Sequence, residues 1–182
     1  MRGPKRRRAP SPLDRSRLNE LALTYVGRFA TTRARLASYL SRKIRERGWA
    51  DEAPAEIEAV VERLSGLGYV DDCQYALSKA RSLTARGYGP RRVNQSLHAA
   101  GIGEEDGEAA RALAGDESVE AALRYARRRR IGPFAVEAPD PNKRERTLAA
   151  MIRAGHGFGI SRAILALGPG DDVDIALLEE KL

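Results

Sequence analysis

The chain repeats itself with a period of about 50 residues, and this repeat restricts the folds that are open to it. Tyr25, Tyr75 and Tyr125 are 50 residues apart, and each opens a segment that runs through basic residues to a glycine. The three glycines, spaced by 53 and 54 residues, are Gly48, Gly101 and Gly155. Repeats of this length are modules that cannot bury a full core alone and that stack on their neighbours.

Composition favours helices as the content of each module. Aromatic residues make up 5% of the chain and charged residues 31%, which suits helices rich in Ala, Leu and Arg better than strands. We therefore expect an all-α fold in which three tandem three-helix modules stack into an elongated, curved array. A module of about 50 residues is marginally stable by itself, so contacts between modules must supply further stability.

Breaks in the apolar pattern divide the chain into four segments. Residues 1–17 are predicted to form a disordered basic arm, because they are polar and rich in proline. The three modules are predicted to span residues 18–68, 69–115 and 116–182. A Pro-rich loop at 131–141 is expected to separate the first two helices of the last module.

Start and stop signals place the helices within these modules. Thr31 or Thr32 is expected to cap the second helix, and Pro54 is expected in the first turn of a third helix that begins at Ala53. A short terminal helix is expected from Asp171. The other helices are predicted near 17–30, 71–86, 89–100, 104–114, 117–130, 142–154 and 160–167.

The net charge of +7 is concentrated in the arm, where seven Lys/Arg and one Asp give +6 and leave +1 for the rest of the chain. Within the modules, basic and acidic helices alternate. Residues 28–49 and 79–98 are rich in arginine, whereas 50–62 and 104–117 are rich in Asp and Glu. A recurrent basic face can follow a phosphate backbone or an acidic protein groove. The alternative is that these arginines only solvate a helix surface.

Ten residues from the basic segments are our candidates for binding a partner or DNA. They are Arg33, Arg35, Arg42, Arg81, Arg86, Tyr88, Arg91, Arg92, Arg127 and Arg128. Tyr88 is included because it lies between two glycines and amid arginines, where its ring can stack on an exposed base. A packing role for Tyr88 is the alternative.

The sequence shows no arrangement typical of an enzyme, a metal site or a cofactor site. Asp71 and Asp72 are interpreted as a helix cap, and His98 and His156 lack the i, i+4 partner of a helix-borne zinc site. The single cysteine, Cys73, excludes an intramolecular disulfide. We expect no catalysis and no cofactor. With neither a long apolar run nor a secretory signal, we also expect a cytoplasmic protein without membrane contact, and a monomer.

One motif in the second module makes the chain recognisable. It combines a hydrophobe with two aspartates, an aromatic-alanine pair, spaced basic residues and a Gly-Ile pair. These stand at Val70-Asp71-Asp72, Tyr75-Ala76, Arg81, Gly87-Tyr88-Gly89, Arg91-Arg92-Val93, Leu97 and Gly101-Ile102. The motif resembles that of the RecX family, the bacterial regulators of the RecA recombinase, and weaker likeness extends from about residue 18 to 178. The long arm and Cys73-Gln74, where a charged residue is often found, depart from the family pattern.

The resemblance implies a protein of tandem three-helix modules that binds along the RecA–DNA filament. Such a protein would restrain ATP hydrolysis, strand exchange and co-protease activity of the recombinase. The implied partners are the recombinase filament and single-stranded DNA, with weaker binding of duplex DNA. An array with a recurrent basic side can engage successive subunits, and linked contacts raise avidity by about 10² to 10⁴.

A helix-turn-helix-like DNA-binding regulator is the alternative function. The predicted helix at 89–100 carries five polar side chains able to reach bases: Arg91, Arg92, Asn94, Gln95 and His98. Such a regulator would prefer one duplex sequence, whereas a filament modulator would bind with little sequence preference. A scaffold for an unrelated acidic protein remains a third class, because the chain beyond the arm is almost neutral.

Overall fold

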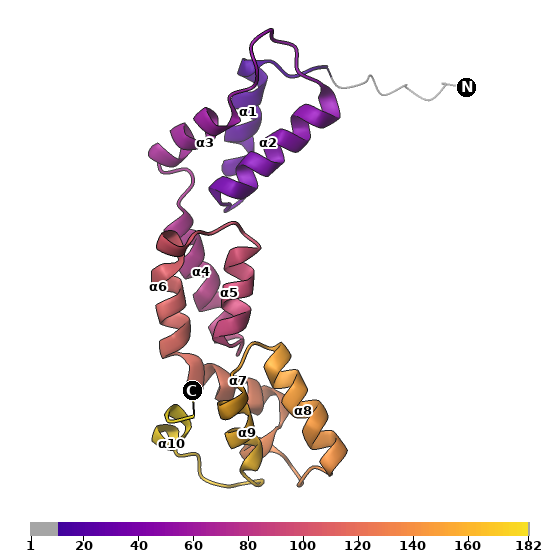
Figure 1. Ribbon diagram of the computed structural model, residues 1–182, viewed down its shortest axis with the longest axis vertical. Helices are drawn as coiled ribbons and strands as arrows, with labels where there is room; N and C mark the ends of the chain where they lie inside the picture. Colours follow the sequence, from indigo (N-terminus) through magenta and orange to yellow (C-terminus); the bar gives the residue numbers. More distant parts are fainter. Residues whose placement is uncertain (1–10, 182) are drawn as a thin grey trace, which may run out of the picture. The chain divides into compact units, whose positions relative to one another are not determined.

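The protein consists of two compact helical units, residues 1–71 and 72–182 (Figure 1). This computed structural model describes residues 11–181, and within that range it contains helices and an isolated backbone bridge but no β-strand. The expected all-α class, a helical array, is confirmed. The predicted disorder of residues 1–10 lies outside the described residues.

The first unit has three helices that surround one apolar cluster. They are α1 (Arg15–Val26), α2 (Arg33–Arg47) and α3 (Ile57–Gly66). The side chains that these helices bury most deeply in the cluster are Leu18, Ala22, Leu36, Leu40 and Leu64. The i, i+4 spacing within α1 and α2 puts each pair on one side of its helix, which explains why these helices pack together.

Polar side chains cap the first two helices. Asp14 accepts a hydrogen bond from the backbone N–H of Arg17 at 2.8 Å. Thr32, one of the two threonines predicted for this role, accepts a hydrogen bond from the N–H of Arg35 at 3.2 Å. Caps of this kind typically contribute about 1 kcal/mol to stability.

The end of the predicted arm belongs to the folded unit, which corrects the boundary expected at residue 17. Leu13 is fully buried, and its N–H donates to the carbonyl of Gly48 at 2.9 Å. Its carbonyl accepts from the N–H of Ala50 at 2.8 Å. Helix α1 then begins at Arg15. Besides Leu13, the Ser11 carbonyl, which accepts from the Arg47 side chain at 3.0 Å, ties this segment to the unit.

Helix α3 begins later than predicted. A start at Ala53 with Pro54 in the first turn is wrong, because the helix begins at Ile57. The indole N–H of Trp49 donates to the carbonyl of Ala53 at 2.7 Å and holds the preceding segment as a loop.

The second unit contains two groups of helices, each around its own apolar cluster. The first group comprises α4 (Asp72–Ala85), α5 (Pro90–His98) and α6 (Glu104–Asp116). The second comprises α7 (Ser118–Arg129), the 3₁₀ turn η1 (Gly132–Phe134), α8 (Pro141–Arg153), α9 (Phe158–Ala166) and α10 (Ile175–Glu179). The terminal helix was expected from Asp171. It starts at Ile175 because Asp171 instead accepts from the N–H of Gly168 at 2.7 Å and closes a turn.

Glycines bring the two groups of the second unit into backbone contact. The N–H of Gly89 donates to the carbonyl of Ala154 at 3.0 Å, and the N–H of Arg91 donates to that of Gly155 at 3.2 Å. A Cβ atom on Gly89 would lie 2.4 Å from the carbonyl oxygen of Gly155. Glycine is therefore required at position 89, where α5 begins and packs against the turn between α8 and α9.

His156 fills the same junction. Its side chain is 1% exposed, its Nε2 lies 3.1 Å from the carbonyl oxygen of Gly87, and its ring meets that of Tyr125 edge-on at 5.4 Å. Burial lowers the pKa of His156 below its ordinary value, and the hydrogen bond to Gly87 opposes this in part. The junction thus joins α4, α7 and the α8–α9 turn.

Candidate functional site

A hollow between α4 and α5 in the second unit is lined by cations without any carboxylate. Its volume is about 390 Å³. The residues that line it are Lys79, Leu83, Arg86, Tyr88, Arg92, Gln95, Ser96 and Ala99. We call it the α4–α5 hollow. Three of the ten predicted site residues, Arg86, Tyr88 and Arg92, meet there.

Helical spacing explains why these side chains converge. Lys79 lies on α4, and Arg86 follows directly after the last residue of that helix, Ala85. The two are seven residues apart, about two helical turns, so both lie on the same side of α4. Arg92 and Gln95 are three apart on α5. Between the helices, the left-handed Gly87 (φ 77°) makes the turn that places Tyr88 in the wall of the hollow.

The positive charge of the hollow is not neutralised internally. The guanidinium of Arg92 donates to the amide oxygen of Gln95 at 2.7 Å, and that of Arg86 donates to the Ser82 carbonyl at 2.9 Å. In the part of the chain that the structure describes, neither arginine forms an ion pair with a carboxylate, and Lys79 forms none either. Three such cations suit a phosphate group.

Tyr88 has two roles in the structure. Its half-buried side chain packs against both apolar clusters of the second unit, and it also lines the hollow. The guanidinium of Arg86 lies 5.8 Å from the centre of the ring. A base that entered the hollow would therefore meet an aromatic ring that is already packed on the protein.

The other candidates in the second unit lie apart from the hollow. Arg81 is exposed on α4 and does not line it, and Arg91 borders a separate hollow of about 280 Å³. On α7, Arg127 lies 4.8 Å from the centre of the Phe134 ring, and Arg128 lies 5.8 Å from that of Tyr125. Candidates that are adjacent in sequence, such as Arg127 and Arg128, thus lie against different parts of the surface.

Helix α2 carries the three candidates of the first unit. Arg33 is half-buried, while Arg35 and Arg42 are exposed. The guanidinium of Arg42 lies 3.4 Å from the carboxylate of Glu46, and 5.6 Å from the centre of the Tyr39 ring. The charge of Arg42 is therefore partly neutralised, unlike that of the arginines in the α4–α5 hollow.

Sequence reasoning missed two features. Lys79 and Gln95, which are not among the ten candidates, complete the α4–α5 hollow, although Gln95 was named for the alternative function. The seven-residue spacing of Lys79 from Arg86 was the signal for Lys79. In the first unit, Tyr25 stacks on Tyr39 at 4.2 Å and lies 5.3 Å from Phe29, which is 56% exposed. Tyr39, the ring that stacks on Tyr25, lies 14 residues further along the chain, so no local signal marked this aromatic group.

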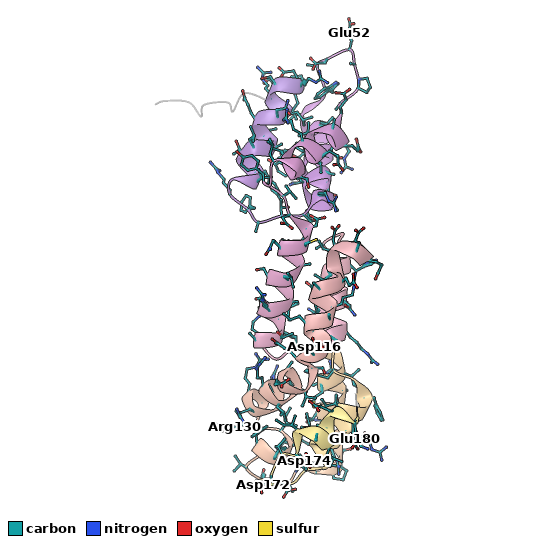
Figure 2. All side chains as sticks on the ribbon, turned by 90° about the vertical axis from the view of Figure 1, so that its left-hand side faces the viewer. Glu52, Asp116, Arg130, Asp172, Asp174 and Glu180 are labelled. Carbon is teal, nitrogen blue, oxygen red and sulfur yellow. The ribbon has the colours of Figure 1, made fainter. Side chains whose placement is uncertain are left out.

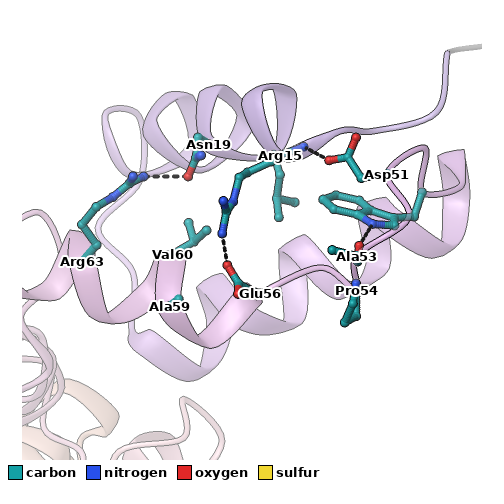
Figure 3. Close-up of a pocket in the computed structure, with 11 residues that line it drawn as sticks. Arg15, Asn19, Asp51, Ala53, Pro54, Glu56, Ala59, Val60 and Arg63 are labelled. Carbon is teal, nitrogen blue, oxygen red and sulfur yellow. Dashed lines mark hydrogen bonds and ion pairs between the residues drawn. The ribbon is translucent and has the colours of Figure 1, made fainter.

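The first unit also has a pocket of about 780 Å³ between α1 and α3 (Figure 3). Its charged groups are paired with other groups of the pocket: the side chain of Arg15 with Glu56, its backbone N–H with Asp51 at 2.9 Å, and Arg63 with Asn19 at 2.6 Å. This pairing makes the pocket a weaker site for an anion than the α4–α5 hollow.

Metal sites and membrane-spanning helices are both absent from residues 11–181. No group of three or more His, Cys, Asp and Glu side chains there is placed to hold a metal ion. Within the same described range, no helix is long and apolar enough to span a membrane.

Comparison with known proteins identifies the family. Residues 71–110, which contain the α4–α5 hollow, match the family described as "RecX, second three-helix domain". The chain is 37% identical to "Regulatory protein RecX" of Myxococcus xanthus (strain DK1622) over 176 residues, which cover 92% of both proteins. It is 30% identical to the protein of the same name from Agrobacterium fabrum (strain C58 / ATCC 33970), over 79% of each.

A solved structure has the same fold. The crystal structure of RecX from Lactobacillus salivarius superposes with a TM-score of 0.58, covers 83% of this chain and 94% of its own, and is 21% identical in sequence. With 37% identity to a RecX protein over nearly its whole length, this chain belongs to the RecX family of regulatory proteins.

Proposed function

We propose that this protein, as a monomer, binds the RecA–DNA filament and restrains ATP hydrolysis, strand exchange and co-protease activity by occupancy. Membership of a family of regulators supports the general role. The α4–α5 hollow supports binding to the DNA of the filament, because it offers three cations without internal carboxylate partners beside an aromatic ring. Single-stranded DNA in the filament presents the matching phosphates and exposed bases.

Several weak contacts are enough for this mode of action. Further basic side chains lie on α2 and α7: Arg35 and Arg42 are exposed, and Arg127 and Arg128 lie against aromatic rings. Contacts on one chain act together, so that the second and later contacts form at a high effective concentration. Inhibition then requires only that the bound protein hinder changes between neighbouring subunits of the filament.

The fold disfavours the helix-turn-helix alternative. Recognition helices read bases with residues near their N-terminus, and α5 is the helix that would take this role. The first turn of α5 is packed: the N–H groups of Gly89 and Arg91 donate to the carbonyls of Ala154 and Gly155. The backbone at the start of α5 is therefore covered by the α8–α9 turn, although the side chains of Arg91 and Arg92 are exposed. This leaves less of the first turn of α5 open to a major groove.

Titration of purified protein into ATP-bound RecA filaments on single-stranded DNA tests the proposal. We expect ATP hydrolysis by RecA to fall with increasing dose, and the protein alone to hydrolyse no ATP. A parallel titration of duplexes of varied sequence should show little preference among them. Unchanged hydrolysis at saturating protein would contradict the proposal, and tight binding to a single duplex sequence would favour the alternative.

A further inference from the structure

A second groove in the second unit differs in chemistry from the α4–α5 hollow. It lies among the end of α7, the loop after η1, the first half of α8 and the end of α9, and its volume is about 340 Å³. We call it the α7–α9 groove. Its apolar wall is formed by Ile131, Val136, Pro139, Leu165 and Leu167.

Close backbone contacts support the wall of this groove. Gly132 is left-handed (φ 57°), and a Cβ atom there would lie 2.3 Å from the carbonyl oxygen of Ile164, so the 3₁₀ turn packs directly on α9. The carbonyl of Pro133 accepts from the N–H of Gly170 at 2.9 Å. These contacts hold the start of the loop in place, yet Val136 in that loop is 83% exposed. The loop thus presents an apolar side chain to solvent at the edge of the groove.

Cations form most of the rim of the groove. Arg129, Arg130 and Lys143 line it, and Glu137 is the acidic residue among them. Within residues 11–181, no ion pair involves any of the three cations. Arg130 ends α7 in a left-handed conformation (φ 54°), which is uncommon for a residue with a side chain, and lies at the surface of the unit (Figure 2).

We propose that the α7–α9 groove binds an acidic peptide segment of a partner protein. One apolar side chain of the peptide lies against Val136, Leu165 and Leu167, and flanking carboxylates face the three cations of the rim. Glu137 accepts hydrogen bonds from backbone N–H groups of the peptide. This combination of apolar walls and unpaired cations is complementary to a chain that carries both apolar and acidic side chains.

A nucleic acid fits this groove less well than a peptide. No aromatic side chain is among the residues that line it, so it lacks the stacking surface that Tyr88 gives the α4–α5 hollow. The Glu137 carboxylate would also repel phosphates, and a phosphate backbone has no N–H groups with which to satisfy it. The proposal does not depend on binding to the RecA filament.

Fluorescence anisotropy with the full-length protein provides the test. The probe is a fluorescein-labelled eight-residue peptide of alternating Asp and Glu with one central leucine, and the comparison peptide has serine in place of leucine. We expect the leucine peptide to bind at least tenfold more tightly. Val136→Glu should weaken its binding at least tenfold, Val136→Leu should retain it, and Lys143→Glu should weaken both peptides.

Two controls make the test specific. Arg153→Glu reverses an exposed charge on the same helix as Lys143 but outside the groove, and it should leave peptide binding within twofold of wild type. An oligothymidylate should not displace the leucine peptide from the groove. Equal affinity for the two peptides, full binding by Val136→Glu, absence of peptide binding, or displacement by oligothymidylate would each overturn the proposal.

Discussion

At the residue scale, the proton on His156 is fixed by its surroundings. A carbonyl only accepts, so Nε2 must carry the hydrogen that bonds to Gly87, and Nδ1 is left without a proton. Nδ1 is buried and has no hydrogen-bond partner among the described residues. Protonation of Nδ1 would place an unsatisfied charge inside the junction between the two helix groups, which is why burial lowers the pKa of His156.

This arrangement predicts a stability loss in mild acid. Below the ordinary histidine pKa of 6.5, the unfolded chain binds a proton that the folded unit resists, so the free energy of unfolding falls as the pH drops from about 7 toward the lowered pKa. His156→Gln retains a donor for Gly87 but does not titrate. The melting temperature of wild type minus that of His156→Gln should therefore decrease between pH 8 and pH 5.

Calorimetry across this pH range checks the prediction. A constant difference between the two proteins would show that His156 is not buried in its neutral form.

At the scale of helices, predictions from sequence worked where local signals act and failed where distant residues pair. Thr32 caps α2 as predicted, because an N-cap depends on residues within one turn. The start of α3 was misplaced because Trp49 holds Ala53 in a loop, and the arm boundary was misplaced because Leu13 pairs with Gly48. Neither contact leaves a local signal in the sequence.

The same contrast holds for the candidate site. Arginine runs predicted basic segments, but only three of the ten chosen residues line the α4–α5 hollow. Arg91 and Arg92 are adjacent in sequence, yet they point to different hollows, because neighbours on a helix are turned by about 100°. The direction of each side chain depends on where its helix packs, which composition does not reveal.

Two glycines that begin helices form a matched pair for testing the junction. Gly89 precedes α5 and Gly103 precedes α6, and both have extended backbone with negative φ that alanine can adopt. A Cβ atom on Gly89 would meet the backbone of Gly155 and His156, whereas one on Gly103 would meet nothing within 4 Å. Gly89→Ala should therefore lower the free energy of unfolding by about 1–3 kcal/mol, and Gly103→Ala should change it by less than about 0.5 kcal/mol.

Urea denaturation of both variants measures this difference. An unaffected Gly89→Ala protein would mean that the two helix groups are not in backbone contact at α5. A comparable loss in both variants would instead indicate a general intolerance of alanine at helix starts.

At the scale of the whole molecule, the net charge does not tell which surfaces are positive. The net charge of +7 is mostly that of residues 1–17, and the remainder is nearly neutral. Carboxylates nevertheless pair with some bases, such as Arg42 and Lys43 with Glu46, and leave those of the α4–α5 hollow unpaired. Local pairing, which sequence totals hide, thus decides where the folded units present positive charge.

Charge reversal in the hollow tests the proposed function most directly. Inhibition of RecA ATP hydrolysis is titrated with wild type, with Arg86→Glu/Arg92→Glu, and with Arg153→Glu/Arg162→Glu, a matched reversal of two exposed arginines of the same unit that lie outside the hollow. All three should have similar far-ultraviolet circular dichroism, since surface substitutions usually change stability by less than about 0.5 kcal/mol. The hollow variant should need at least tenfold more protein for half-inhibition, while the control should match wild type. Equal inhibition by all three proteins would contradict the assignment of filament binding to the α4–α5 hollow.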